Sequence, residues 1–389
     1  MTRDAAPYWI IPKALFNDGK LVTGWGVLVD QGEIKQVELE SRIADQKKVF
    51  LDKILAPGYI DLQVNGGGDV LFNTDPTPDG ICKIAKAHRQ FGTVAILPTV
   101  ITDAPDVLER AAQAILDLGP HPDVLGIHIE GPHISKTRRG THNPNFIRSF
   151  DTTTLRLIER LRAADVFVKI TLAPEKISIQ DIRKLAEMEV LVSLGHTNAT
   201  LEETQVALDA GASCFTHLFN AMPPIINRNP GVTVAALNSD AYAGLICDGH
   251  HVSDEVLKMA LRAHRRNDRM FIVSDSMPTI GGQSSFELYG SKVNVINGKL
   301  INSDGNLAGA HITQARGVVR LIGALEQPLE RALAMAIAIP ADAVSRPDLK
   351  RINERKLEDC ILLNETGEIS YLSQELKDND AGISAIGPE

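Results

Sequence analysis

Short apolar runs alternate with amphipathic stretches through the middle of this chain. Residues 106–118 place Val107, Ala111 and Ile115 at helical spacing, which predicts a helix with one buried face. Other apolar runs of about five residues are nearly unbroken, as is typical of parallel strands buried on both faces. The alternation predicts repeated β–α units that begin after Pro57-Gly58.

The two ends of the chain have a different pattern, in which apolar and polar residues alternate over short distances. Residues 25–30 and 33–37 flank Gln31-Gly32, and this arrangement predicts a β-hairpin. Near the other end, residues 359–364 and 367–372 again have the pattern of short strands. Both ends are therefore expected to be rich in β-structure.

These patterns together predict an α/β fold with two parts. We expect a (β/α)8 TIM-like barrel over residues 57–345, and a small β-sandwich module built from residues 1–56 and 346–389. Residues 376–389 are polar and are expected to form a loose tail.

The composition narrows the choice of partner and compartment. The 389 residues carry a formal net charge of −9, which disfavours binding to nucleic acid or to anionic membrane surfaces. The four cysteines show no CxxC spacing, so free thiols are expected rather than a disulfide framework or a cysteine zinc site. The first residues lack the features of a signal peptide, and no apolar run is long enough to span a membrane. We expect a cytoplasmic protein that acts on a small molecule.

Five apolar runs are each followed, within two residues, by a side chain suited to catalysis. These side chains are Glu130, His196, His217, Asp248 and Asp275. In an α/β barrel the carboxyl ends of the strands meet at one mouth, where catalytic groups gather. The repetition predicts that these residues converge on one site.

The residue types also indicate which chemistry the site performs. Glu130, His196 and His217 offer one carboxylate oxygen and two imidazole nitrogens, a set that binds catalytic zinc and leaves a position for water. Asp275 is the candidate general acid/base. Taken alone, each of the first three could be an ordinary hydrogen-bonded residue at a strand end, and Asp275 could cap a helix or turn.

Eight segments between residues 57 and 310 follow one another in the order typical of one enzyme family. They are Pro57-Gly-Tyr-Ile-Asp-Leu-Gln-Val-Asn-Gly66, Gly126-Ile-His-Ile-Glu-Gly-Pro132, Gly140-Thr-His-Asn-Pro-Asn145, Leu194-Gly-His-Thr-Asn198, Thr216-His-Leu-Phe-Asn-Ala-Met222, Arg228-Asn-Pro-Gly231, Asp248-Gly-His-His251 and Leu307-Ala-Gly309. In these segments the chain resembles the N-acetylglucosamine-6-phosphate deacetylases of the metal-dependent amidohydrolase superfamily.

The resemblance implies the same metal ligands, Glu130, His196 and His217, and the same catalytic aspartate, Asp275. It adds His142 as the group that polarises the acetyl carbonyl or its oxyanion. We expect one divalent metal ion per subunit, with Zn2+ favoured and Fe2+, Mn2+ or Co2+ as alternatives.

The first barrel strand departs from many amidohydrolases, which carry a His-x-His pair for a second metal. Here the corresponding segment is Asp61-Leu62-Gln63. This difference favours a single-metal site, and Gln63 becomes a candidate site residue.

The resemblance also implies a set of contacts to an amino-sugar phosphate. His251 corresponds to a histidine that contacts the sugar, and Asn220 and Ala221 lie where the family meets the sugar or phosphate. Leu307 is expected to pack against the acetyl methyl group. Arg228 corresponds to a phosphate-binding arginine that reaches the neighbouring subunit's site, which implies a homodimer.

The expected reaction is hydrolysis of the acetamide of N-acetyl-D-glucosamine 6-phosphate to D-glucosamine 6-phosphate and acetate. A metal-activated water would be the nucleophile, with Asp275 as general base and then general acid. One alternative is a different N-acylated sugar phosphate, such as N-acetylgalactosamine 6-phosphate. Another is a catalytically inactive barrel that binds a sugar phosphate, and the intact ligand set counts against it.

Overall fold

The computed structural model describes residues 6–44, 47–303 and 305–370, together with Glu375. The tail expected at 376–389 lies outside the described residues, as do the last two residues of the strand expected at 367–372.

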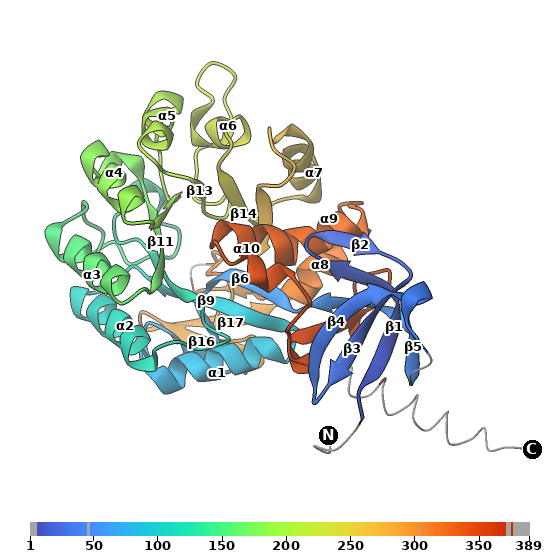
Figure 1. The fold of residues 1–389 in the computed structure, drawn as a ribbon. Helices are drawn as coiled ribbons and strands as arrows, with labels where there is room; N and C mark the ends of the chain where they lie inside the picture. The colour runs from blue at the N-terminus through green and yellow to red at the C-terminus, as the bar shows by residue number, and fades with distance from the viewer. Residues whose placement is uncertain (1–5, 45–46, 304, 371–374, 376–389) are drawn as a thin grey trace, which may run out of the picture.

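An eight-stranded parallel sheet forms the centre of the molecule (Figure 1). In chain order, its strands are β6 (Tyr59–Val64), β9 (Thr93–Ile101), β10 (Gly126–Glu130), β11 (Phe167–Leu172), β12 (Leu191–Leu194), β13 (Cys214–Phe215), β14 (Tyr242–Ile246) and β15 (Met270–Val273). The order in the sheet is the order in the chain, so each strand pairs with the one before it. This confirms the TIM-like barrel.

A helix follows each barrel strand and covers its outer side (Figure 1). These helices are α1 (Pro78–Arg89), α2 (Pro105–Leu118), α3 (Thr152–Ala163), α4 (Ile179–Glu187), α5 (Leu201–Asp209), α6 (Gly231–Leu237), α7 (Asp254–Ala263) and α8 (Gln314–Gly323). Two shorter helices, α9 (Leu329–Leu333) and α10 (Ile339–Ala343), come after α8. None of the helices in the described part of the chain has the length and apolar character needed to cross a membrane.

Side-chain caps determine where several helices begin, which in turn places the loops of the site. The Thr200 hydroxyl accepts a hydrogen bond from the Glu203 amide, and the Glu203 carboxylate accepts one from the Thr200 amide. Ser253 caps α7 in a similar way by accepting from the Val256 amide. These caps fix the first residues of α5 and α7, so the loops before these helices end at Thr200 and Ser253.

The barrel closes between β15 and β6 with help from a buried side chain. The Asp275 amide donates to the Gln63 carbonyl at 3.0 Å. The Asp61 carboxylate accepts from the backbone amides of Ser274 and Gln63, each at 3.2 Å. Asp61 is fully buried, and burial raises its pKa to about 7. Asp61 therefore acts as a structural link across the seam.

The β-rich ends combine into one seven-stranded sheet, seen to one side of the helical ring in Figure 1. Its strands are β1 (Tyr8–Asn17), β2 (Lys20–Val22), β3 (Trp25–Asp30), β4 (Glu33–Leu39), β5 (Lys48–Pro57), β19 (Cys360–Leu363) and β20 (Ile369–Ser370). β5 lies between β1 and β19, so the two ends of the chain pair directly. The sheet has its own apolar core, which includes Ile10, Val27 and Leu362. A module built from both ends is confirmed, while its boundaries at 56 and 346 stay a prediction.

The chain between β15 and α8 forms a small antiparallel sheet, which was not expected from the sequence pattern. It consists of β16 (Ser285–Leu288), β17 (Ser291–Ile296) and β18 (Lys299–Ile301). An isolated bridge pairs Leu307 with Ile301 of β18, so the small sheet adjoins the loop that carries Leu307. A shorter ribbon of β7 (Gly66–Gly67) and β8 (Val70–Leu71) follows the first barrel strand.

We predict that Asp61→Ala destabilises the fold by about 1–3 kcal/mol for each backbone amide left unpaired at the seam. Asp61→Asn keeps an acceptor oxygen and is expected to cost less. Because folding raises the pKa of Asp61, the wild type loses stability as pH rises from about 5 to about 8, and Asp61→Asn lacks this loss. Thermal melts at both pH values check this, and a wild type whose advantage over Asp61→Asn grows with pH would contradict it.

Candidate active site

The predicted site residues converge at the carboxyl ends of the barrel strands, around a pocket of about 210 Å³. Those that line the pocket are Glu130, His142, His196, His217, Asn220, Ala221, His251, Asp275 and Leu307. They come from the ends of five barrel strands or the loops after them, so only the closed barrel brings them together.

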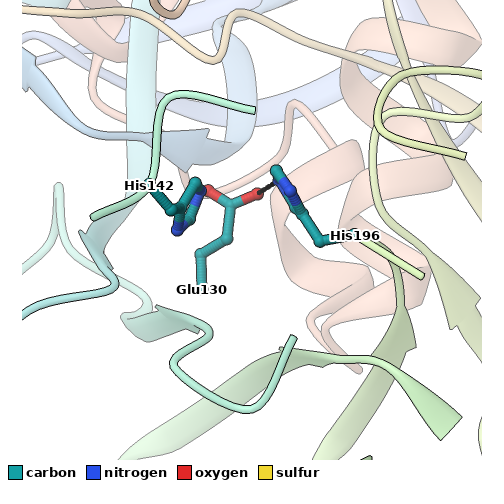
Figure 2. Close-up of side chains that lie close together, drawn as sticks. All are labelled: Glu130, His142 and His196. Atoms are coloured by element: carbon teal, nitrogen blue, oxygen red, sulfur yellow. Dashed lines mark ion pairs between the residues drawn. The ribbon is translucent and has the colours of Figure 1, made fainter. Parts of the chain in front are cut away.

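The most tightly packed part of the pocket is centred on the Glu130 carboxylate, at the end of β10. Glu130, His142 and His196 point toward one another in Figure 2, and their ligand atoms lie within 4.8 Å of one another. His217 completes the group, because its Nε2 lies 3.0 Å from Glu130 Oε1. This buried cluster could hold a metal ion.

The spacing of three of these atoms suits a tetrahedral metal centre. Glu130 Oε1, His196 Nε2 and His217 Nε2 are separated by 3.0, 3.1 and 3.3 Å. Ligand atoms about 2.0–2.1 Å from a tetrahedral zinc are roughly 3.3 Å apart. The three atoms therefore already lie close to the positions that a shared ion requires.

Backbone groups determine which ring nitrogen of two histidines carries the proton. His196 Nδ1 lies 2.8 Å from the Arg138 carbonyl, which can only accept, so Nε2 keeps its lone pair. For His142 the reverse holds, because the Thr102 amide can only donate to Nδ1, at 3.3 Å. The proton of His142 is therefore on Nε2. Burial and the neighbouring His196 lower the pKa of His142 to about 3, so the ring is neutral.

The charge of Glu130 is balanced inside the protein. Burial opposes ionisation of Glu130, but the neighbouring His196 and His217 rings hold its pKa well below the usual range. The Gln63 amide group also donates to Glu130 Oε1, at 3.1 Å. Glu130 is therefore an anion in a site that is 2% exposed.

Asp275 is held by two amide side chains from the first barrel strand and the loop after it. Gln63 Nε2 and Asn65 Nδ2 donate to Asp275 Oδ1, at 3.0 and 2.8 Å. Burial, followed by the charge of Glu130, raises the pKa of Asp275. Gln63 thus bridges the two carboxylates, and a carboxyl whose pKa is raised is suited to exchanging a proton near neutral pH.

Four site residues have a backbone conformation that side chains rarely adopt. The φ angles of His196, His217 and Asp275, each just after a barrel strand, are 48°, 28° and 48°, and that of Ala221 is 52°. Non-glycine residues in this left-handed region are uncommon and occur preferentially at functional sites. The sharp turn after each strand directs these side chains toward the barrel axis.

The pocket lining also includes two polar side chains outside the Glu130 cluster, His251 and Asn220, which could contact a bound substrate. The Asp248 carboxylate accepts from His251 Nδ1 at 2.7 Å and from the His251 backbone amide at 2.9 Å. Asp248 therefore orients the His251 ring rather than lining the pocket itself. Asn220 is tied to the His217 carbonyl through its side chain, at 3.2 Å.

Arg228 is the one predicted residue that lies away from the pocket of its own chain. It is exposed in the loop between β13 and α6, beside the exposed apolar side chains of Ile225 and Ile226. This position leaves it available to another subunit.

Three partners of the site residues were missed in the sequence. Asn65 was overlooked although it follows the first barrel strand, and its place at a strand end was a usable signal. Thr102 follows β9 in the same way. The Arg138 carbonyl is a backbone group, and no sequence pattern reveals where it points.

The fold and the site can be compared with known proteins. Matching against models of known protein families gives no hit. The same fold occurs in enamidase, a member of the amidohydrolase superfamily, with a TM-score of 0.55 at 11% identity. The crystal structure of N-acetylglucosamine-6-phosphate deacetylase from Pasteurella multocida has a TM-score of 0.86 at 31% identity, over 94% of this chain and 97% of that one.

Two curated relatives also align over most of their length. N-acetylgalactosamine-6-phosphate deacetylase of Shewanella sp. strain ANA-3 is 37% identical over 83% of this chain and 84% of its own. N-acetylglucosamine-6-phosphate deacetylase of Haemophilus influenzae is 32% identical over 88% of this chain and 91% of its own.

Fold and site together define a TIM-like barrel with a candidate metal site at its mouth, and enamidase has the same fold. Within that class, the chain belongs to the N-acetylglucosamine-6-phosphate deacetylase family.

Proposed function

We propose that this protein hydrolyses the acetamide of N-acetyl-D-glucosamine 6-phosphate to D-glucosamine 6-phosphate and acetate. The observation that carries this proposal is the arrangement of Glu130, His196 and His217 at 3.0–3.3 Å, with Asp275 on the same pocket. A protein of this family with an intact set of this kind is an enzyme, which argues against an inactive sugar-phosphate-binding barrel.

In this proposal the metal ligands are Glu130, His196 and His217. A metal needs an unprotonated ring nitrogen, and His196 directs one toward Glu130 because its other nitrogen donates to the Arg138 carbonyl. His142 directs an N–H into the pocket instead, which supports its role as a hydrogen-bond donor rather than a ligand.

One divalent ion per subunit is proposed, because Gln63 occupies the first-strand position as a neutral amide that donates to Glu130 and Asp275. The mixed nitrogen and oxygen set suits Zn2+ and also accepts Fe2+, Mn2+ or Co2+. Such an ion would polarise the amide carbonyl and activate water.

Asp275 is proposed to move the proton. Both amide donors bind Oδ1, which leaves Oδ2 to take a proton from the attacking water. The Nε2–H of His142 is placed to donate to the oxyanion of the tetrahedral intermediate, an interaction worth about 3–4 kcal/mol in comparable sites. When the C–N bond breaks, Asp275 returns its proton to the sugar nitrogen, so the products are an amine and acetate.

The remaining pocket residues are proposed to hold the substrate. Leu307 would pack against the acetyl methyl group, while Asn220, Ala221 and His251 would contact the sugar and its phosphate. All four line the pocket. The protein is proposed to be cytoplasmic.

The two candidate substrates, N-acetylglucosamine 6-phosphate and N-acetylgalactosamine 6-phosphate, differ only in the configuration at C4 of the sugar. The 37% identity to the Shewanella enzyme is the observation that favours N-acetylgalactosamine 6-phosphate as the alternative. We predict that the metal-loaded protein releases acetate from both sugars and has a higher kcat/KM for the gluco substrate. Acetate release with each pure sugar phosphate measures this, and a higher kcat/KM for the galacto substrate would reverse the assignment. No turnover of either would overturn the deacetylase proposal.

Metal content should separate ligands from other catalytic residues. His196→Ala is expected to lose most bound metal and activity together, because it removes one of three ligands. Asp275→Asn and His142→Asn should lower kcat by about a hundredfold or more while metal content stays near wild type. Elemental analysis paired with the acetate assay checks this. If His142→Asn lost its metal as His196→Ala does, His142 would be a ligand.

A homodimer is proposed in which Arg228 binds the substrate phosphate in the neighbouring subunit's site. Exposed Ile225 and Ile226 precede this arginine in the same loop. Apolar side chains of that kind suit a buried contact between two copies of the chain. The forked guanidinium of Arg228 matches a phosphate group.

We expect Arg228→Ala to raise KM at least tenfold with little change in kcat, because it removes a charged contact remote from the scissile bond. Mixing Arg228→Ala with Asp275→Asn chains should recover part of the activity, since a mixed dimer contains one site with both residues intact. Size-exclusion chromatography provides the control for dimer formation. A monomer with full activity would contradict this prediction.

A further inference from the structure

The small β16–β18 sheet contains an unusual residue at the tip of one hairpin. Several two-residue hairpin turns in the protein have positive φ at both positions: Asp18-Gly19, Gln31-Gly32, Tyr289-Gly290 and Asn297-Gly298. Asn-Gly and Asp-Gly are the pairs that such turns prefer. Tyr289, with a φ of 50°, is the bulkiest residue in this conformation among these turns. A strained, bulky residue at this position calls for a role outside the turn.

The hydroxyl of Tyr289 binds one of the two loops that flank the catalytic pocket. It donates a hydrogen bond of 2.6 Å to the Thr102 carbonyl, in the loop after β9. Asn143, in the other loop, lines one surface hollow together with Tyr289. Burial, and then the nearby Asp103, raises the pKa of Tyr289, so the hydroxyl keeps its proton and remains a donor at neutral pH.

Both loops lead directly to His142. Asn143 is its neighbour in the chain, and Thr102 binds His142 Nδ1 through its amide at 3.3 Å and its hydroxyl at 2.7 Å. Both contacts orient the ring, and the amide, which can only donate, makes Nδ1 an acceptor and so places the proton on Nε2. Tyr289 and His142 also line one surface hollow that shares Thr141 and Leu307 with the catalytic pocket.

We propose that Tyr289 is a positioning residue for the deacetylation reaction: its hydroxyl clamps Thr102, which holds His142 Nδ1, and so aims the His142 Nε2–H at the substrate carbonyl. This inference rests on the proposed function of His142. It makes the β16–β18 sheet part of the catalytic apparatus, acting at a distance from the reacting atoms.

Tyr289→Phe removes only the hydroxyl and is the central test. We expect kcat to fall about fivefold to tenfold, as for loss of one well-placed hydrogen bond, while KM changes less than twofold. The melting temperature should stay within about a degree of wild type, because the ring and the turn are retained. Tyr242→Phe is the matched control. Tyr242 lies at the start of β14, away from the pocket, and its hydroxyl accepts a hydrogen bond from Arg269.

Two further variants separate positioning from simple stability. Tyr289→Asn supplies a residue that the turn prefers, so it should lower kcat at least as much as Tyr289→Phe without lowering the melting temperature. In a His142→Asn background, Tyr289→Phe should have no further effect on kcat, because the two residues act through one group. A kcat for Tyr289→Phe equal to wild type, or losses that multiply in the double variant, would overturn the proposal.

Hydrogen–deuterium exchange tests the clamp without any substrate. Amides of residues 139–145 should exchange at least fivefold faster in Tyr289→Phe than in wild type, while Tyr242→Phe leaves them unchanged. Unchanged exchange of this segment in Tyr289→Phe would refute the clamp even if the enzyme were active. Faster exchange in a protein that turns over neither sugar phosphate would instead contradict the proposed function alone.

Discussion

One oxygen atom, Glu130 Oε1, organises the site. It is within 3.3 Å of nitrogens from His196, His217 and Gln63, which come from three other barrel strands or the loops after them. A buried carboxylate is tolerated only when it is paired and hydrogen-bonded, so each of these contacts depends on the barrel being closed. The same distances suit a shared cation, because the Nε2 atoms of His196 and His217 lie where nitrogen ligands of an ion bound to Glu130 would lie. The contacts that stabilise the buried Glu130 carboxylate are therefore the same contacts that would position a metal ion.

Closure of the barrel is what brings the proton-transfer group to that oxygen. Asp275 lies after the last barrel strand and Gln63 in the first, and the seam between them is held partly by the Asp61 carboxylate. The Asp275 amide also donates to the Gln63 carbonyl across this seam, so the Gln63 side chain lies between Glu130 and Asp275. The first barrel strand thus supplies a buried structural acid, Asp61, and a neutral bridge, Gln63, and both hold Asp275 in position.

Much of the fold and of the inner site could be predicted from the sequence, because both depend on short-range patterns. Apolar runs that end in Glu130, His196, His217 and Asp275 indicated strand ends at a barrel mouth, and strands do end there. The positive φ angles of the last three could not be predicted, since they arise from how the chain leaves a closed barrel. The Arg138 carbonyl was equally invisible, because any residue would supply the same group. The β16–β18 sheet was missed since its short, mixed strands lack the long apolar runs of the barrel.

The proposed catalytic groups are attached to two kinds of backbone, strand ends and a long loop. The candidate metal ligands and Asp275 are attached to strand ends inside the barrel, where neighbouring strands fix their positions. His142 is attached to a long loop, and a loop allows more motion than a strand end. A donor that must meet a developing oxyanion needs its position held closely, since a small displacement weakens its hydrogen bond steeply. His142 is instead held by Thr102, directly after β9, and the β16–β18 sheet reaches this point because the Tyr289 hydroxyl donates to the Thr102 carbonyl.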